Sequence, residues 1–215
     1  MEGFINNTIN IENKGVGVKS YDNKITTSLV FSLAFAVLMA ISANSFVYLP
    51  FTPVPITMQV LTVLLSGIFL GSRWALASQT IYVFMGLMGL PVFSGFKNGA
   101  IALTGPTGGY IVGFMVAAFV TGYLYENSGK RINNNPLRHL FAGFISCLAG
   151  VVVIHLFGYI HLFGYLFSLT GTKSISDTLT KTWKLGTQPF IAIDFLKILI
   201  ALSILNLNKI KNEKD

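Results

Sequence analysis

Residues 86–113 read GLMGLPVFSGFKNGAIALTGPTGGYIVG and connect two long apolar parts of the chain. The stretch holds eight glycines, two prolines and one formal charge, at Lys97. Glycine and proline disfavour helix interiors, so one continuous helix is excluded. Lipid offers no hydrogen-bond partner, and irregular backbone beside apolar spans is tolerated where it is buried in protein or lines a cavity. The stretch therefore predicts a binding-site loop between two membrane helices, with a surface loop outside the membrane as the alternative.

The composition of the whole chain predicts an integral membrane protein. Of its 215 residues 53% are hydrophobic and 11% are charged, and the mean hydropathy is +0.66. A soluble domain carries about 25% charged residues. The net charge of +7 comes from Lys and Arg that lie between apolar stretches, which indicates membrane topology rather than nucleic-acid binding. The single cysteine, Cys147, excludes an intrachain disulfide and a multi-cysteine metal site.

Apolar stretches divide the chain into six predicted membrane spans, so the expected fold is all-α with the glycine-rich loop between helices 3 and 4. A proline-rich turn, PFTPVP at 50–55, separates the first two spans, and Gly71-Ser72-Arg73 separates the next two. Residues 171–184 predict an amphipathic interfacial segment before the last span. We expect one membrane domain over 25–208, a polar cytoplasmic tail over 1–24 and a basic cytoplasmic tail over 209–215. The spans are 25–49, 56–70, 74–90, 107–125, 139–159 and 186–206.

The distribution of Lys and Arg predicts the orientation in the cytoplasmic membrane. With six spans, both ends and alternate loops lie on one side. That side carries ten of these residues, against four on the other and Lys197 inside the last span. By the positive-inside rule both termini are then cytoplasmic, and the glycine-rich loop faces outward. The ten are Lys14, Lys19, Lys24, Arg73, Lys130, Arg131, Arg138, Lys209, Lys211 and Lys214, and the four are Lys97, Lys173, Lys181 and Lys184.

Two opposite charges lie inside the last predicted span. Asp194 and Lys197 are three residues apart, so their side chains share a helix face and can meet. Each costs about 2.5–3.5 kcal/mol at the centre of a membrane helix, so the pair predicts a functional site. Lys can attract a carboxylate and Asp can accept N–H bonds, which suits a small ligand with both groups. The alternative is an internal ion pair that fixes the rotation of the helix.

Other residues near the loop can complete a pocket but none indicates catalysis or a metal. Aromatic side chains at Tyr82, Phe93, Phe96 and Tyr110 can form walls, and Asn98 can donate and accept hydrogen bonds. The chain contains no HExxH, GxSxG, CxxC or P-loop motif, so any ATP hydrolysis must come from another subunit. Three histidines, His139, His155 and His161, fall at predicted membrane edges, where an interfacial role is commoner than metal binding.

Four motifs occur together in an order that resembles the BioY family, the biotin-binding S components of energy-coupling factor (ECF) vitamin transporters. They are PVPITMQ at 53–59, GLPVF at 89–93, GPTGGY at 105–110 followed by Gly113-Phe114, and PF with D-x-x-K at 189–197. The resemblance covers most of the chain from the second span to the last. It implies a six-helix S-component fold that captures biotin from outside, without a cofactor or an enzyme activity of its own. Its implied partners are a transmembrane coupling subunit, two cytoplasmic ATPases and membrane lipid.

The resemblance also implies roles for individual residues. Asp194 and Lys197 are expected to be polar partners of biotin, with Phe93, Asn98 and the loop Gly105, Gly108, Gly109 and Tyr110 around it. Small residues at four-residue spacing, Ala36 and Ala40, resemble the stripe by which S components dock on the coupling subunit. The same stripe can instead pack closely inside the bundle. The family pattern has a glycine directly before the Asp, where this chain has Ile193.

Three other functions are compatible with these residues. An S component can have the same architecture and bind a different small vitamin. A small intramembrane enzyme could use Asp194 as a base, although no second catalytic motif accompanies it. A structural membrane subunit could use the ion pair only to orient a helix. Binding, competition and product formation distinguish the three.

Overall fold

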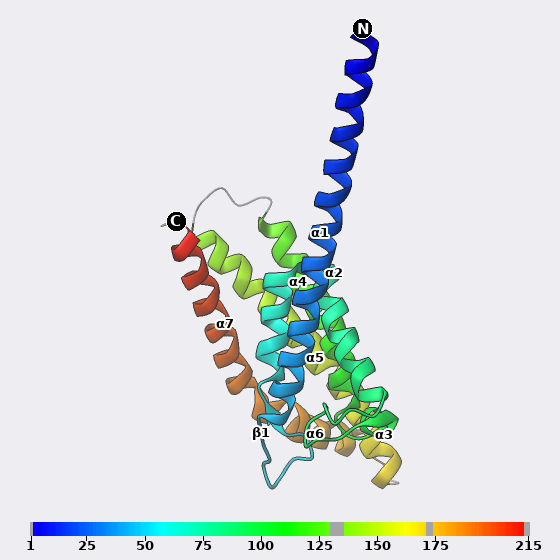
Figure 1. Cartoon of the computed structure of the whole chain (residues 1–215). Coiled ribbons are helices and arrows are strands. Elements are labelled where there is room, and N and C mark those ends of the chain that lie inside the picture. The colour runs from blue at the N-terminus through cyan, green and yellow to red at the C-terminus, as the bar shows by residue number, and fades with distance from the viewer. Residues whose placement is uncertain (1, 130–135, 171–173, 213–215) are drawn as a thin grey trace.

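The chain forms a bundle of long helices with irregular segments gathered at one end (Figure 1). The computed structural model describes residues 2–129, 136–170 and 174–212, and the side chains of 23–128, 137–169 and 174–207. The start of α1 and the end of α7 lie at one end of the bundle, and α3 and α6 lie at the other (Figure 1). The helices are α1 (Glu2–Asn44), α2 (Gln59–Leu87), α3 (Gly99–Thr104), α4 (Gly108–Gly129), α5 (Pro136–Thr170), α6 (Ile175–Gly186), the 3₁₀ turn η1 (Gln188–Phe190) and α7 (Ile191–Asn212).

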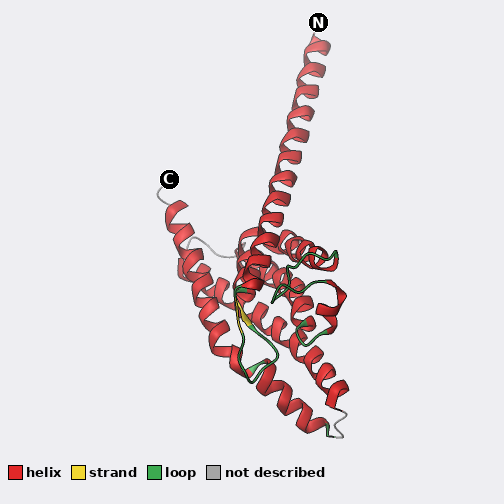
Figure 2. Cartoon of the chain, turned by 60° about the horizontal axis from the view of Figure 1, so that its bottom comes forward, coloured by secondary structure: helices red, strands yellow, loops and turns green. Residues whose placement is uncertain are grey.

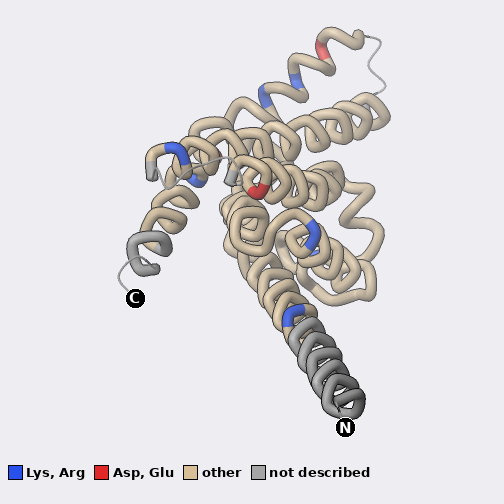
Figure 3. Tube along the Cα trace, turned by 90° about the horizontal axis from the view of Figure 1, so that it is seen from above, with Lys and Arg blue, Asp and Glu red and all other residues tan. Residues whose placement is uncertain are grey.

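Five stretches of the described residues are long and apolar enough to cross a membrane: 23–44, 59–87, 108–128, 137–169 and 175–207. Charged residues are sparse along the trace seen in Figure 3, as a membrane-embedded bundle requires. All six predicted spans are largely helical, and most of two of them, 56–70 and 74–90, belongs to α2.

α2 is a helical hairpin that folds back at Gly71. The backbone there has φ 75° and ψ 173°, which interrupts the helix. A straight helix would separate Gln59 from Tyr82 by about 34 Å at 1.5 Å per residue. Instead, the Gln59 amide donates a hydrogen bond of 3.0 Å to the Tyr82 hydroxyl. The predicted Gly71-Ser72-Arg73 break is therefore a tight turn, and its Ser72 hydroxyl donates a bond of 2.8 Å to Glu126 on α4.

Substituting Gly71→Ala is expected to destabilise the bundle by about 1–3 kcal/mol, because few side chains tolerate this backbone conformation. A Cβ at this position would also meet the carboxylate of Glu126. Gly164→Ala in α5 is the matched control, because nothing lies within 4 Å of its Cβ. Alanine there should be neutral or stabilise by about 0.5–1 kcal/mol. Thermal unfolding of both variants in detergent measures the difference, and equal melting temperatures would contradict the assigned role of the turn.

Several helix boundaries differ from the sequence prediction. α1 begins at Glu2, so the backbone of the expected polar tail is helical. It ends at Asn44 rather than Leu49, because strand β1 (Phe46–Val47) pairs with β2 (Ile56–Thr57) around the proline-rich turn (Figure 2). α5 continues to Thr170, past the predicted end at Tyr159. The expected interfacial segment is a separate helix, α6, which lies across the lower end of the bundle in Figure 1.

Candidate ligand-binding site

A pocket lies at the end of the bundle that carries the irregular segments. The cavity has a volume of about 50 Å³ and is open at its mouth. Pockets that enclose small ligands typically measure about 300–1,000 Å³, so this cavity would have to widen to enclose one. It is lined by Val54, Pro55, Thr57, Gln59, Val60, Tyr82, Ser94, Thr107, Tyr110, Ile111, Phe114, Ile154, His155, Phe190, Asp194 and Lys197.

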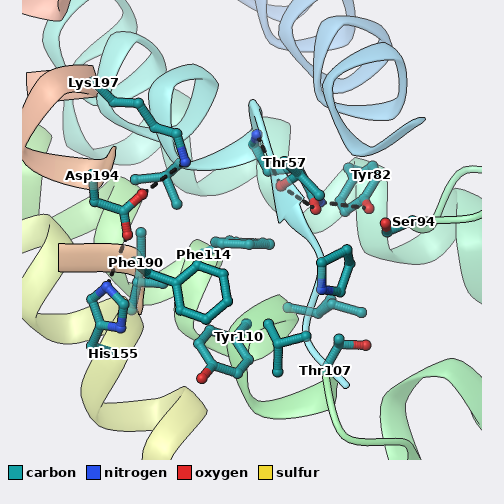
Figure 4. A pocket seen from close by; sticks show the side chains of 16 residues that line it. Thr57, Tyr82, Ser94, Thr107, Tyr110, Phe114, His155, Phe190, Asp194 and Lys197 are labelled. Atoms are coloured by element: carbon teal, nitrogen blue, oxygen red, sulfur yellow. Dashed lines mark hydrogen bonds and ion pairs between the residues drawn. The ribbon is translucent and has the colours of Figure 1, made fainter. Parts of the chain in front are cut away.

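Three polar side chains meet at one end of this pocket (Figure 4). The Lys197 ammonium lies 2.7 Å from Asp194 Oδ1, which confirms that the pair meets across one turn of α7. His155 Nε2 on α5 lies 2.8 Å from Asp194 Oδ2. Asp194 and Lys197 are 2% and 4% exposed, so both charges are almost fully removed from solvent. Buried charges of this kind persist only when they are paired and hydrogen-bonded.

A second polar group lies at the other end of the pocket (Figure 4). The Thr57 hydroxyl donates to the Gln59 amide oxygen at 3.1 Å, and the amide nitrogen donates to Tyr82. These two bonds fix the orientation of the Gln59 amide. Ser94 Oγ is buried and has no hydrogen-bond partner among the described residues. A hydroxyl in that state can bind a ligand, since leaving it unsatisfied is costly.

Apolar side chains separate the two polar ends. Phe190, Phe114 and Tyr110 lie between them in Figure 4, from η1 and α4. Tyr110 is fixed at its far end, where its hydroxyl donates a bond of 2.6 Å to the Gly186 carbonyl oxygen at the end of α6. The lining therefore suits a molecule with polar groups at two ends and an apolar middle.

The glycine-rich stretch forms the loop that was predicted, and α3 is inserted in it. Gly89, Gly95 and Gly99 have φ of 97°, 74° and 71°, a region that favours glycine. From this stretch Ser94, Thr107, Tyr110 and Ile111 line the pocket. Phe93 is 1% exposed and packs edge-on against Tyr82, behind the lining residues.

Other predicted loop residues shape the loop without lining the pocket. The Asn98 side chain is exposed and donates a bond of 3.0 Å to the Gly89 carbonyl oxygen. The Gly105 carbonyl oxygen lies 2.9 Å from His161 Nε2 on α5. Gly108 packs against the backbone of Leu103, and Gly109 packs against α5, where a Cβ would meet other atoms. A ligand contact by these residues stays a prediction.

The small-residue stripe of α1 packs inside the bundle. Ala36 is fully buried, and Ala40 is partly buried against the core. The nearby Ser32 and Ser42 bond to Trp74 and Thr62 of α2, which shows the face on which the helices meet. The sequence left close packing within the bundle open as the alternative to docking, and the structure shows that packing. Docking through Ala36 and Ala40 stays a prediction.

Two of the histidines that were expected at membrane edges form hydrogen bonds within the protein. His155 bonds to Asp194 in the pocket, and His161 bonds to the glycine-rich loop. Both lie inside the extended helix α5, which the sequence interpretation ended too early. They begin the two copies of HLFGY at 155–159 and 161–165. Among the described residues no group of three His, Cys, Asp or Glu side chains could hold a metal ion.

The bundle is similar in fold to a solved structure described as the S-component for biotin from an ECF-type ABC transporter. The TM-score is 0.70 at 24% sequence identity, over 87% of this chain and 93% of that one. The chain therefore has the S-component fold.

The family follows from sequence comparison. A model described as the BioY family matches residues 12–212. The biotin transporter BioY of Thermotoga maritima is 36% identical over 176 residues, which cover 81% of this chain and 92% of that protein. The biotin transporter BioY of Rhizobium etli is 32% identical over 177 residues, covering 82% and 89%. The chain belongs to the BioY family.

Proposed function

We propose that this protein binds biotin and takes it up across the cytoplasmic membrane as the substrate-binding subunit of an ECF-type transporter. The observation that carries the proposal is the buried group Asp194, Lys197 and His155 in the pocket of a BioY-family chain. Binding rather than catalysis fits a pocket without a nucleophile beside a base. No cofactor is required for this role.

The chemistry of biotin matches the pocket. Biotin carries a carboxylate on an aliphatic chain, an apolar sulfur-containing ring and a cyclic urea. Lys197 can pair with the carboxylate, while Asp194 holds the Lys197 ammonium in place. The Tyr82 and Ser94 hydroxyls at the second polar end can donate hydrogen bonds to a carbonyl oxygen. Phe190, Phe114 and Tyr110 supply the apolar middle.

The sequence has no P-loop motif, so under this proposal other subunits must hydrolyse the ATP that drives transport. Energy would come from two cytoplasmic ATPases acting through a transmembrane coupling subunit. The ten-to-four distribution of Lys and Arg supports cytoplasmic termini and a pocket that opens outward.

The proposed function is tested by uptake of labelled biotin in bacterial cells that lack their own biotin transporter. Cells expressing this chain with a coupling subunit and ATPases should accumulate biotin, and cells expressing the coupling proteins alone should not. Unlabelled biotin should compete, whereas riboflavin and thiamine should not. Uptake of another vitamin in place of biotin would assign the protein to a different ligand.

The Asn98→Ala variant tests whether Asn98 supports the fold of the loop or contacts the ligand directly. Because Asn98 bonds to Gly89 at an exposed site, its removal should weaken biotin binding by only about 2- to 10-fold, as expected for one neutral hydrogen bond. Equilibrium binding to the purified variant measures the change. A loss beyond about 100-fold would show that Asn98 reaches the ligand when the loop closes.

A further inference from the structure

His155 is the third polar residue at the charged end of the pocket, and no motif or spacing rule assigns it a role. It lies on α5, 39 residues before Asp194 in the chain. Its side chain is 13% exposed. Its ring lies edge-on to Tyr110 with centroids 6.4 Å apart, and it is tilted against Phe190 at the same distance. Neighbours on two other elements thus hold the ring in place.

The hydrogen bond to Asp194 determines which ring nitrogen carries a proton. A carboxylate only accepts, so the 2.8 Å contact requires a proton on His155 Nε2. In the neutral ring Nδ1 is then an acceptor. Nδ1 is buried, and no partner for it is present among the described residues. His155 therefore holds Asp194 Oδ2 through one nitrogen, while the other is available for a second proton.

A second proton on His155 would balance the charge of the pocket when an anionic ligand binds. Asp194 and Lys197 are the only Asp, Glu, Lys or Arg residues that line it, so their charges cancel. The titratable groups around the His155 ring are Asp194 and Lys197 on α7 and Tyr110 on α4. A carboxylate that enters this buried space adds one uncompensated negative charge, which is costly. An imidazolium at position 155 would restore neutrality and remain bonded to Asp194.

We propose that His155 is a positioning residue for Asp194 and that it takes up the proton that accompanies an anionic ligand into the pocket. The proton comes from solvent and is added to Nδ1, while Nε2–H keeps its bond to Asp194 Oδ2. The identity of the ligand as biotin rests on the proposed function. The bond to Asp194 does not depend on that identity.

Two substitutions separate the hydrogen bond from the packing of the ring. His155→Phe keeps an aromatic ring beside Tyr110 and Phe190 but removes both nitrogens. His155→Gln places an amide N–H near the position of Nε2 without a group that titrates. Loss of a hydrogen bond to a charged group should weaken biotin binding by about 10- to 100-fold in His155→Phe. The His155→Gln variant should stay within about 5-fold of the wild type, as a retained bond predicts.

Calorimetry in two buffers of different ionisation enthalpy counts the protons bound with the ligand. The wild type should take up about one proton per biotin, and His155→Gln should take up none. Biotin methyl ester, which lacks the negative charge, should bind without proton uptake. Wild-type affinity in His155→Phe, or equal proton uptake in the wild type and His155→Gln, would overturn the proposal.

A ligand-free measurement keeps this test separate from the test of biotin binding. In the ¹⁵N spectrum of histidine-labelled protein, the His155 signal is identified by its loss in His155→Phe. It should show the Nε2–H tautomer and should shift in Asp194→Asn. If biotin does not bind the wild type but this shift occurs, biotin is not the ligand and the positioning of Asp194 stands. An Asp194→Asn spectrum with an unchanged His155 signal would refute the positioning role.

Discussion

Lys197→Ala is expected to weaken biotin binding by at least about 30-fold, because removing one partner of a buried charge contact costs about 2–5 kcal/mol. Lys197 is the only Lys or Arg among the residues that line the pocket, and it is 4% exposed. The carboxylate of the ligand would then face Asp194 with no fixed cation beside it. Equilibrium binding of labelled biotin to the purified variant in detergent measures the loss.

Lys181→Ala is the control for the loss of one positive charge. Lys181 lies on α6, is exposed and does not line the pocket. Its replacement should leave the affinity within about 2-fold of the wild type, since interactions between exposed charges are weak. Equal losses in the two variants would indicate a general effect of net charge rather than a contact at Lys197. An unchanged affinity in Lys197→Ala would remove that residue from the site.

Asp194→Ala is expected to cost about 3–5 kcal/mol of folding stability in addition to ligand binding, because it leaves Lys197 buried without a counter-charge. Lys197→Ala should cost less, since Asp194 keeps its hydrogen bond to His155. The double variant Asp194→Ala with Lys197→Met removes both charges and retains apolar volume, so it should recover much of the stability without recovering binding. Thermal unfolding in detergent gives the stability order, and biotin binding gives the second readout.

The expected order of melting temperatures is wild type, then the double variant and Lys197→Ala, with Asp194→Ala lowest. Recovery of biotin binding in the double variant would contradict a direct role for the two charges. A stable Asp194→Ala protein that has lost biotin binding would mean that the pair serves the ligand and contributes little to the fold.

Local rules predicted the parts of the site that lie close together in sequence. The three-residue spacing of Asp194 and Lys197 places them on one helix face, and the structure joins them at 2.7 Å. The glycine content of residues 86–113 predicted irregular backbone, and three of these glycines have positive φ. Gly71 was predicted to break the helix, and it forms the turn of the α2 hairpin.

Tertiary contacts between distant segments could not be predicted in this way. His155 meets Asp194 only because α5 packs beside α7, and no spacing rule links residues 39 positions apart. Asn98 has side-chain chemistry suited to a ligand, but the path of the loop turns it toward Gly89. The hydropathy pattern extended the predicted first span to Leu49, because the apolar residues of a short strand cannot be told from the continuation of an apolar helix. Phe46 and Val47, near the end of the predicted span, form that strand, β1.

Equilibrium binding of labelled biotin to the purified wild-type protein in detergent tests the central claim most directly. We predict saturable binding of one biotin per chain that excess unlabelled biotin displaces, that Lys181→Ala retains and that Lys197→Ala loses. A folded wild-type protein that binds no biotin under these conditions would contradict the assignment of this pocket to biotin.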